Sequence, residues 1–101
     1  MHRPKTMTDY IEIVKQAIFE VEDLRAAAEW GADDGEGVGF EFTDPLTALL
    51  RQLVEQLSMN THSFGGDDLE LMSIVRTNAR QIPFKGLFDI INQTHRLGLD
   101  V

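Results

Sequence analysis

Apolar residues recur every three or four positions along most of the chain, which is the spacing of one face of an α-helix. In the first third, this face comprises Ile11, Val14, Ala17, Ile18, Val21, Leu24 and Ala28. Asp9 and Glu12 are spaced as a capping-box pair at the start, and Gly31 suits the left-handed conformation that ends many helices. The pattern predicts a helix over residues 10–30.

The broadest apolar stripe lies in the segment "TDPLTALLRQLVEQL" and comprises Leu46, Leu49, Leu50, Leu53, Val54 and Leu57. Asp44 is a good N-cap residue, and Pro45 fits the first helical position, where its missing N–H is not needed. We expect Arg51 and Glu55 to form an i,i+4 ion pair outside the stripe. The segment predicts a second helix that supplies much of the core.

Two more helices are predicted in the second half of the chain. Asp67 and Glu70 form another capping-box pair, and the helix they start carries an apolar side of Leu71, Met72, Val75, Ala79 and Ile82. Pro83 should break this helix. A fourth helix over residues 84–97 should end at Gly98, with Phe84, Leu87, Phe88 and Ile91 on its apolar face. The 101 residues therefore predict an all-α, four-helix bundle-like single domain with a flexible tail at residues 1–7.

The connection between the first two helices, residues 31–43, is long, acidic and rich in glycine. Such connections usually take 2–8 residues, so this one points to a functional loop. Val38, Phe40 and Phe42 alternate, and an extended backbone would place them on one side. Two interpretations stay open, a lid over the bundle and a strand edge that binds a partner. The candidate partner-binding residues are Trp30, Asp33, Asp34, Glu36, Phe40 and Phe42.

The formal net charge of −8 is concentrated near the N-terminus, because residues 8–43 hold ten of the 17 acidic residues and only two basic ones. This surface would repel a phosphate backbone, which argues against nucleic-acid binding. No apolar run approaches the length of a membrane span or a signal-peptide core, so we expect a cytoplasmic protein without a membrane partner. The absence of cysteine excludes disulfides, thiolate metal sites and thiol nucleophiles.

No motif for catalysis or for a cofactor stands out. A calcium loop centred on Gly37 would have Ala32 and Thr43 at two essential ligand positions. The three histidines lack the spacing that places two ligands on one helix face. His62 lies in a polar connector near two acidic residues, where a transient metal contact stays open. His95 is expected to be partly buried near the end of the last helix. We therefore predict no catalytic residue, metal or cofactor.

These features favour a protein–protein interaction or regulatory module without catalysis, whose partner is another protein or a second copy in a homodimer. The alternative is an enzyme or an anion or small-molecule sensor with a site between the third and fourth helices, formed by Arg76, Arg80, Lys85 and His95. A third hypothesis is an acidic mimic of nucleic acid that blocks a basic protein.

Overall fold

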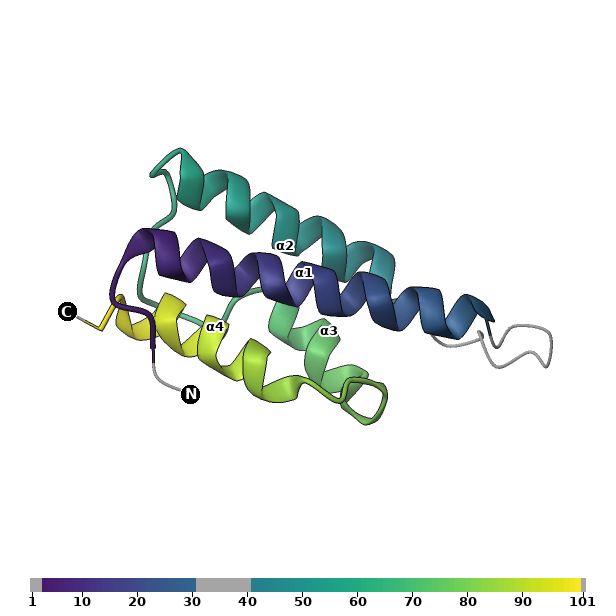
Figure 1. The fold of residues 1–101 in the computed structure, drawn as a ribbon. Helices are drawn as coiled ribbons and strands as arrows, with labels where there is room; N and C mark the ends of the chain where they lie inside the picture. The colour runs from purple at the N-terminus through teal and green to yellow at the C-terminus, as the bar shows by residue number, and fades with distance from the viewer. Residues whose placement is uncertain (1–2, 31–40, 101) are drawn as a thin grey trace.

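Four amphipathic helices enclose one core in the computed structural model, which describes residues 3–30 and 41–100 (Figure 1). They are α1 (Met7–Trp30), α2 (Thr43–Ser58), α3 (Leu71–Thr77) and α4 (Lys85–Leu97), with a short 3₁₀ helix, η2 (Ala79–Gln81), between the last two. Helices α1 and α3 each pack against both α2 and α4, and α1 runs antiparallel to α2 and α4. The described residues contain no strand, and the prediction of an all-α, bundle-like fold is confirmed.

The core is built largely from the stripes that the sequence predicts, with Tyr10 of α1 as a buried residue that the predicted stripe did not include. From α2, Leu46, Leu50, Leu53 and Leu57 are buried, and from α1 the buried residues are Tyr10, Val14, Ala17 and Val21. Helices α3 and α4 add Leu71, Met72, Val75, Phe88 and Ile91. Because full burial of one such apolar side chain contributes about 1.5–3 kcal/mol, the shared core is the main source of stability. It also fixes which face each helix presents to solvent.

Helix α1 begins three residues earlier than predicted. The Thr6 hydroxyl accepts a hydrogen bond from the Asp9 N–H at 3.1 Å, so Thr6 is the capping residue and Asp9 occupies the third helical position. Thr6 and Asp9 are both residue types that cap helices. The prediction of Asp9 as the cap was wrong, because the helix starts earlier and Thr6 caps it.

Helix α2 begins at Thr43, one residue before the predicted cap. Phe42 precedes it with helical angles (φ −61°, ψ −20°), so the predicted extended backbone is wrong at this residue. Asp44 does not cap the helix, because its carboxylate pairs with Arg25 of α1. Arg51 was predicted to pair with Glu55 within α2, but it pairs with Glu22 of α1 instead. Contacts between the helices thus replace the contacts expected within one helix.

Helix α3 is shorter than predicted at both ends. It starts at Leu71 rather than Asp67, because contacts of residues 67–69 to α4 hold this segment in a non-helical path. It stops at Thr77, well before Pro83. The Asn78 side chain donates to the Ile74 carbonyl at 2.9 Å, and Asn78 itself leaves the helical region (φ −113°). The amide side chain therefore interrupts the helix before the proline is reached.

The first and last described residues meet beside the end of α4. Gly98 ends that helix with a positive φ of 86°, a conformation open to glycine at little cost. The Arg3 guanidinium donates to the Gly98 carbonyl at 3.3 Å, and the Asp100 N–H donates to the Pro4 carbonyl at 2.9 Å. Pro4 is buried. Arg3 and Pro4 of the predicted tail at residues 1–7 are thus bonded to the segment that follows α4, and residues 1–2 lie outside the described residues.

Candidate functional site

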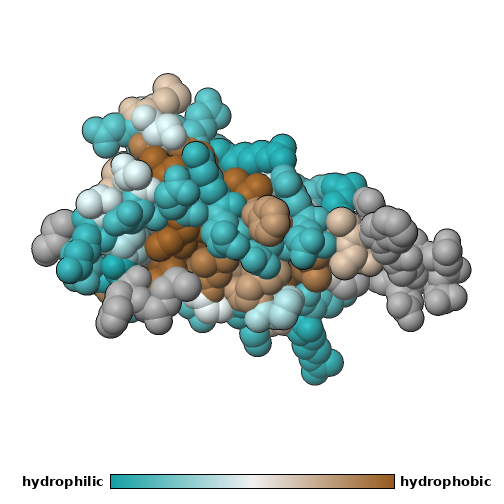
Figure 2. Space-filling model, in the orientation of Figure 1, coloured by the Kyte–Doolittle hydropathy of each residue, from teal (hydrophilic) through white to brown (hydrophobic). Residues whose placement is uncertain are grey.

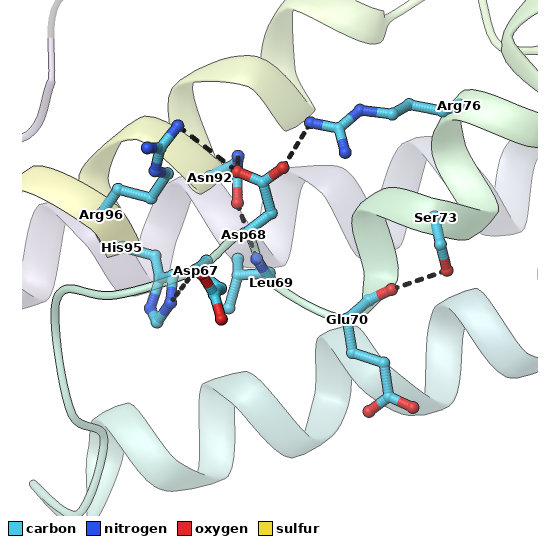
Figure 3. Close-up of polar contacts among 9 residues, drawn as sticks. All are labelled: Asp67, Asp68, Leu69, Glu70, Ser73, Arg76, Asn92, His95 and Arg96. Carbon is cyan, nitrogen blue, oxygen red and sulfur yellow. Dashed lines mark hydrogen bonds and ion pairs between the residues drawn. The ribbon is translucent and has the colours of Figure 1, made fainter.

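The Asp68 carboxylate is the centre of a polar cluster that joins the segment before α3 to α4 (Figure 3). Its Oδ1 accepts a hydrogen bond from Asn92 Nδ2 at 2.9 Å, and its Oδ2 lies 2.7 Å from Arg76 Nη2. Arg96 approaches from α4, with Nη1 at 3.5 Å from Oδ1. The hydrogen bond from Asn92, followed by that from Arg76, holds the pKa of Asp68 below its ordinary value. Asp68 is thus a charged acceptor whose two oxygens are both engaged.

Asn92 connects this carboxylate to the backbone. Its Oδ1 accepts a hydrogen bond from the Leu69 N–H at 2.8 Å, while its amide nitrogen donates to Asp68. One buried side chain on α4 therefore fixes two consecutive residues of the connector. Among the described residues, every buried side-chain nitrogen or oxygen has a hydrogen-bond partner. The Asp68 cluster is consequently well suited to holding α3 against α4.

Two histidines that are far apart in the sequence meet next to this cluster. His62 Nε2 and His95 Nδ1 are 2.9 Å apart, and the other nitrogen of His95 lies 3.0 Å from the Asp67 carbonyl oxygen. His95 is only 9% exposed, as expected for a partly buried histidine near the end of this helix. Among the described residues, no group of three or more histidine and acidic side chains is placed to hold a metal ion.

The connector that carries His62 is itself held in place. Its backbone is tied to α4 by a hydrogen bond of 2.6 Å from the Gly65 N–H to the His95 carbonyl. The Phe64 ring packs edge-on against the His62 ring, with centroids 5.0 Å apart. Burial, and then the charge of the neighbouring His95, lowers the pKa of His62. The half-buried His62 imidazole is therefore mainly neutral at neutral pH.

A separate feature, a groove of about 640 Å³, lies between α1 and α4. Its lining residues are Gln16 and Glu20 of α1, together with Phe84, Gly86, Leu87, Asp89, Ile90 and Gln93 at or before α4. Figure 2 shows apolar atoms exposed between polar ones over the region where these two helices lie side by side. The bottom of the groove is thus apolar, and its upper edges are polar or acidic.

The edge of α1 beside this groove is strongly acidic. Because successive helical residues are about 100° apart, the exposed or half-buried residues Glu12, Gln16, Glu20 and Asp23 fall within about 80° of one another around α1. Asp89 lies on the α4 side. Next to this edge, the side chain of Phe19 is 63% exposed. We call the groove with these residues the α1–α4 groove. An apolar floor between carboxylates is suited to an apolar ligand with flanking positive charges.

The residues predicted for partner binding are mostly outside the described part of the chain. Phe42 is half-buried and packs against the core. Trp30 is the last residue of α1, but its side chain lies outside the described residues, as do Asp33, Asp34, Glu36 and Phe40. Their role in partner binding stays a prediction.

The four residues predicted for an anion site are not brought together. Lys85 and His95 stand near opposite ends of α4, about 15 Å apart at 1.5 Å per residue. Arg76 is paired with Asp68, and His95 faces His62. Arg80 is exposed in η2. These positions do not favour a shared pocket.

Sequence reasoning missed both the histidine pair and the α1–α4 groove. His62 and His95 are separated by two connectors and a helix, so no local spacing reveals their contact. For the groove, two signals were available: Phe19 falls outside the apolar stripe of α1, and Gly86 places a residue without a side chain in the first turn of α4. A large apolar residue on the polar face and a gap on the facing helix together indicate an uncovered apolar surface.

No protein-family model matches the chain, and neither the curated proteins nor the solved structures include one with significant similarity to it. None of the described helices combines the length and apolar character needed to cross a membrane.

Proposed function

We propose that this protein is a protein-binding module whose α1–α4 groove receives an amphipathic helix of a partner protein in the cytoplasm. The observation that carries the proposal is the groove of about 640 Å³ with an apolar floor and carboxylates on both edges. Helices bind such grooves through apolar residues spaced three or four apart, which point into the floor. Leu87 and Ile90 of the floor are themselves three apart on α4, so they form a surface that extends along the groove.

The charge around the groove indicates the kind of helix that fits. Glu20 and Asp89 line opposite edges, and Glu12 and Asp23 extend the acidic edge of α1. A partner helix with Lys or Arg beside its apolar anchors would gain favourable contacts and faster association. A second copy of this chain is the less favoured occupant, because each copy has a formal charge of −8. We therefore favour a basic partner over the homodimer.

Photocrosslinking in cells tests this proposal directly. A photoreactive phenylalanine analogue replaces Gln93, an exposed residue that lines the groove. The matched control carries the same analogue at Ala48, which is exposed on α2 and is not a lining residue of the groove. We expect a specific crosslink from position 93 to a segment with apolar residues at helical spacing and flanking Lys or Arg, and no such product from position 48.

Two results of that experiment would contradict the proposal. A crosslink between two copies of this chain would favour a homodimer, and equal products from positions 93 and 48 would show that the groove is not a binding surface. The proposal also predicts that Gly86→Leu, which fills the groove, reduces the crosslink. Gly86→Ala serves as its control, because the added Cβ meets no atom within 4 Å.

A further inference from the structure

The geometry of the His62–His95 pair points to a metal site, and we propose that it binds one divalent ion of the Zn²⁺ class. The two nitrogens that face each other, His62 Nε2 and His95 Nδ1, would be the protein ligands. This site is separate from the α1–α4 groove, and the inference does not depend on the proposed function. Imidazole nitrogen is a preferred ligand of Zn²⁺, Cu²⁺ and Ni²⁺, whereas Mg²⁺ and Ca²⁺ prefer oxygen.

The Asp67 carbonyl determines which nitrogen of His95 can bind. A carbonyl oxygen only accepts hydrogen bonds, so His95 Nε2, at 3.0 Å from it, carries the ring proton. In the neutral ring the lone pair is then on Nδ1, which faces His62. A histidine that donates its second ring N–H to a backbone carbonyl is the usual arrangement of a metal ligand, because this bond fixes the ring orientation. His95 Nδ1 is therefore the nitrogen of this ring that is available to an ion.

The separation of the two nitrogens suits a shared ion. With Zn–N bonds of about 2.0–2.1 Å, two ligands lie about 2.9 Å apart at a right angle and about 3.3 Å apart at a tetrahedral angle. The observed separation is 2.9 Å, and the ring centroids are 4.9 Å apart. In the hydrogen-bonded pair the His95 lone pair points along the line between the two nitrogens, so each ring would turn by roughly 35–45° for both lone pairs to meet at one ion.

In the metal-free protein, His62 Nε2–H donates to His95 Nδ1. Binding requires that the His62 proton moves from Nε2 to Nδ1, so that two neutral imidazoles coordinate the ion without loss of a proton. Since the described residues offer no third histidine or carboxylate, water would complete the coordination, which leaves positions open to a further ligand.

The test is titration of the full-length protein with Zn²⁺ by isothermal calorimetry, with Mg²⁺ as the control ion. We expect one Zn²⁺ per chain, no comparable heat with Mg²⁺, and at least about tenfold weaker binding in His62→Ala and His95→Gln, since each removes one of two ligands. His2→Ala is the matched control, because it removes the third imidazole of the chain and should leave the affinity unchanged. Far-UV circular dichroism checks that each variant remains helical.

Nuclear magnetic resonance of the imidazole nitrogens supplies a readout that does not depend on folding of the variants. In the wild type, Zn²⁺ should shift the resonances of His62 Nε2 and His95 Nδ1, while His95 Nε2 keeps its proton. The absence of saturable Zn²⁺ binding would overturn the inference. So would wild-type affinity in His62→Ala, or an equal loss of binding in His2→Ala.

Discussion

Tyr10, the single tyrosine of the chain, couples the stability of the bundle to alkaline pH. Its side chain is 0% exposed, and its hydroxyl donates to the Ile91 carbonyl at 2.8 Å. Burial raises the pKa of Tyr10 above its ordinary value of 10.0. The folded state therefore keeps the phenolic proton, while the unfolded chain releases it as the pH rises past about 10. Folding stability must fall above that pH.

The magnitude follows from the linkage of proton binding to folding. Above pH 10, the Tyr10 contribution falls by up to about 1.4 kcal/mol per pH unit, which amounts to about 2 kcal/mol between pH 9.5 and pH 11.5. Tyr10→Phe removes this dependence, and it also removes a buried hydrogen bond worth about 1 kcal/mol. The wild type should thus be more stable than Tyr10→Phe by about 1 kcal/mol at pH 7 and less stable by a similar amount at pH 11.5.

The assay is urea unfolding of both proteins, followed by circular dichroism from pH 7 to pH 11.5. Every other group that changes with pH is common to both proteins, so its effect largely cancels in the difference. The two stability curves should cross at about pH 10.6. A stability difference that does not change with pH would refute the reasoning, as would a folded-state phenol absorbance that titrates near pH 10.

Two further predictions concern Asp68 and Gly98. The pKa of Asp68 is lowered in the folded state, so its contribution is present above the unfolded value of 3.8 and is lost as the pH falls through the folded value. Asp68→Asn should therefore reduce the loss of stability that urea unfolding measures in the wild type as the pH falls below the unfolded value. Gly98→Ala should destabilise the protein by about 1 kcal/mol or more, because φ is +86° there. Gly86→Ala should not destabilise the protein. Equal melting temperatures for Gly98→Ala and Gly86→Ala would contradict the claim that the positive φ of Gly98 requires glycine.

The sequence predicts the helices better than it predicts their ends. The leucine stripe of α2 is visible because burial on one face imposes a 3.6-residue period on the chain itself. The start of α3 is different, since Asp67 and Glu70 satisfy a local capping pattern that the fold overrides. Asp68 and Leu69 are bound instead by Asn92, which lies on another helix and has no sequence signal that links it to them.

The candidate sites depend on such long-range contacts even more. His95 could be expected to be partly buried from its place on α4, but its partner His62 belongs to a connector with no periodic pattern. The groove is likewise a property of two helices together. Leu87 of its floor is predicted as part of the α4 apolar face and Ile90 is not, whereas its acidic edge comes from α1. Only the packing of α1 against α4 shows that this floor is left partly uncovered.

The most direct test of the protein-binding account is the affinity of the crosslinked partner segment, measured as a fluorescent synthetic peptide by anisotropy. Gly86→Leu should weaken binding at least about tenfold by filling the groove, while Gly86→Ala should bind like the wild type. Raising the salt from about 50 mM to about 500 mM should weaken binding to the wild type, because the acidic edges are screened. Equal affinity of the wild type and Gly86→Leu for the peptide would contradict the account.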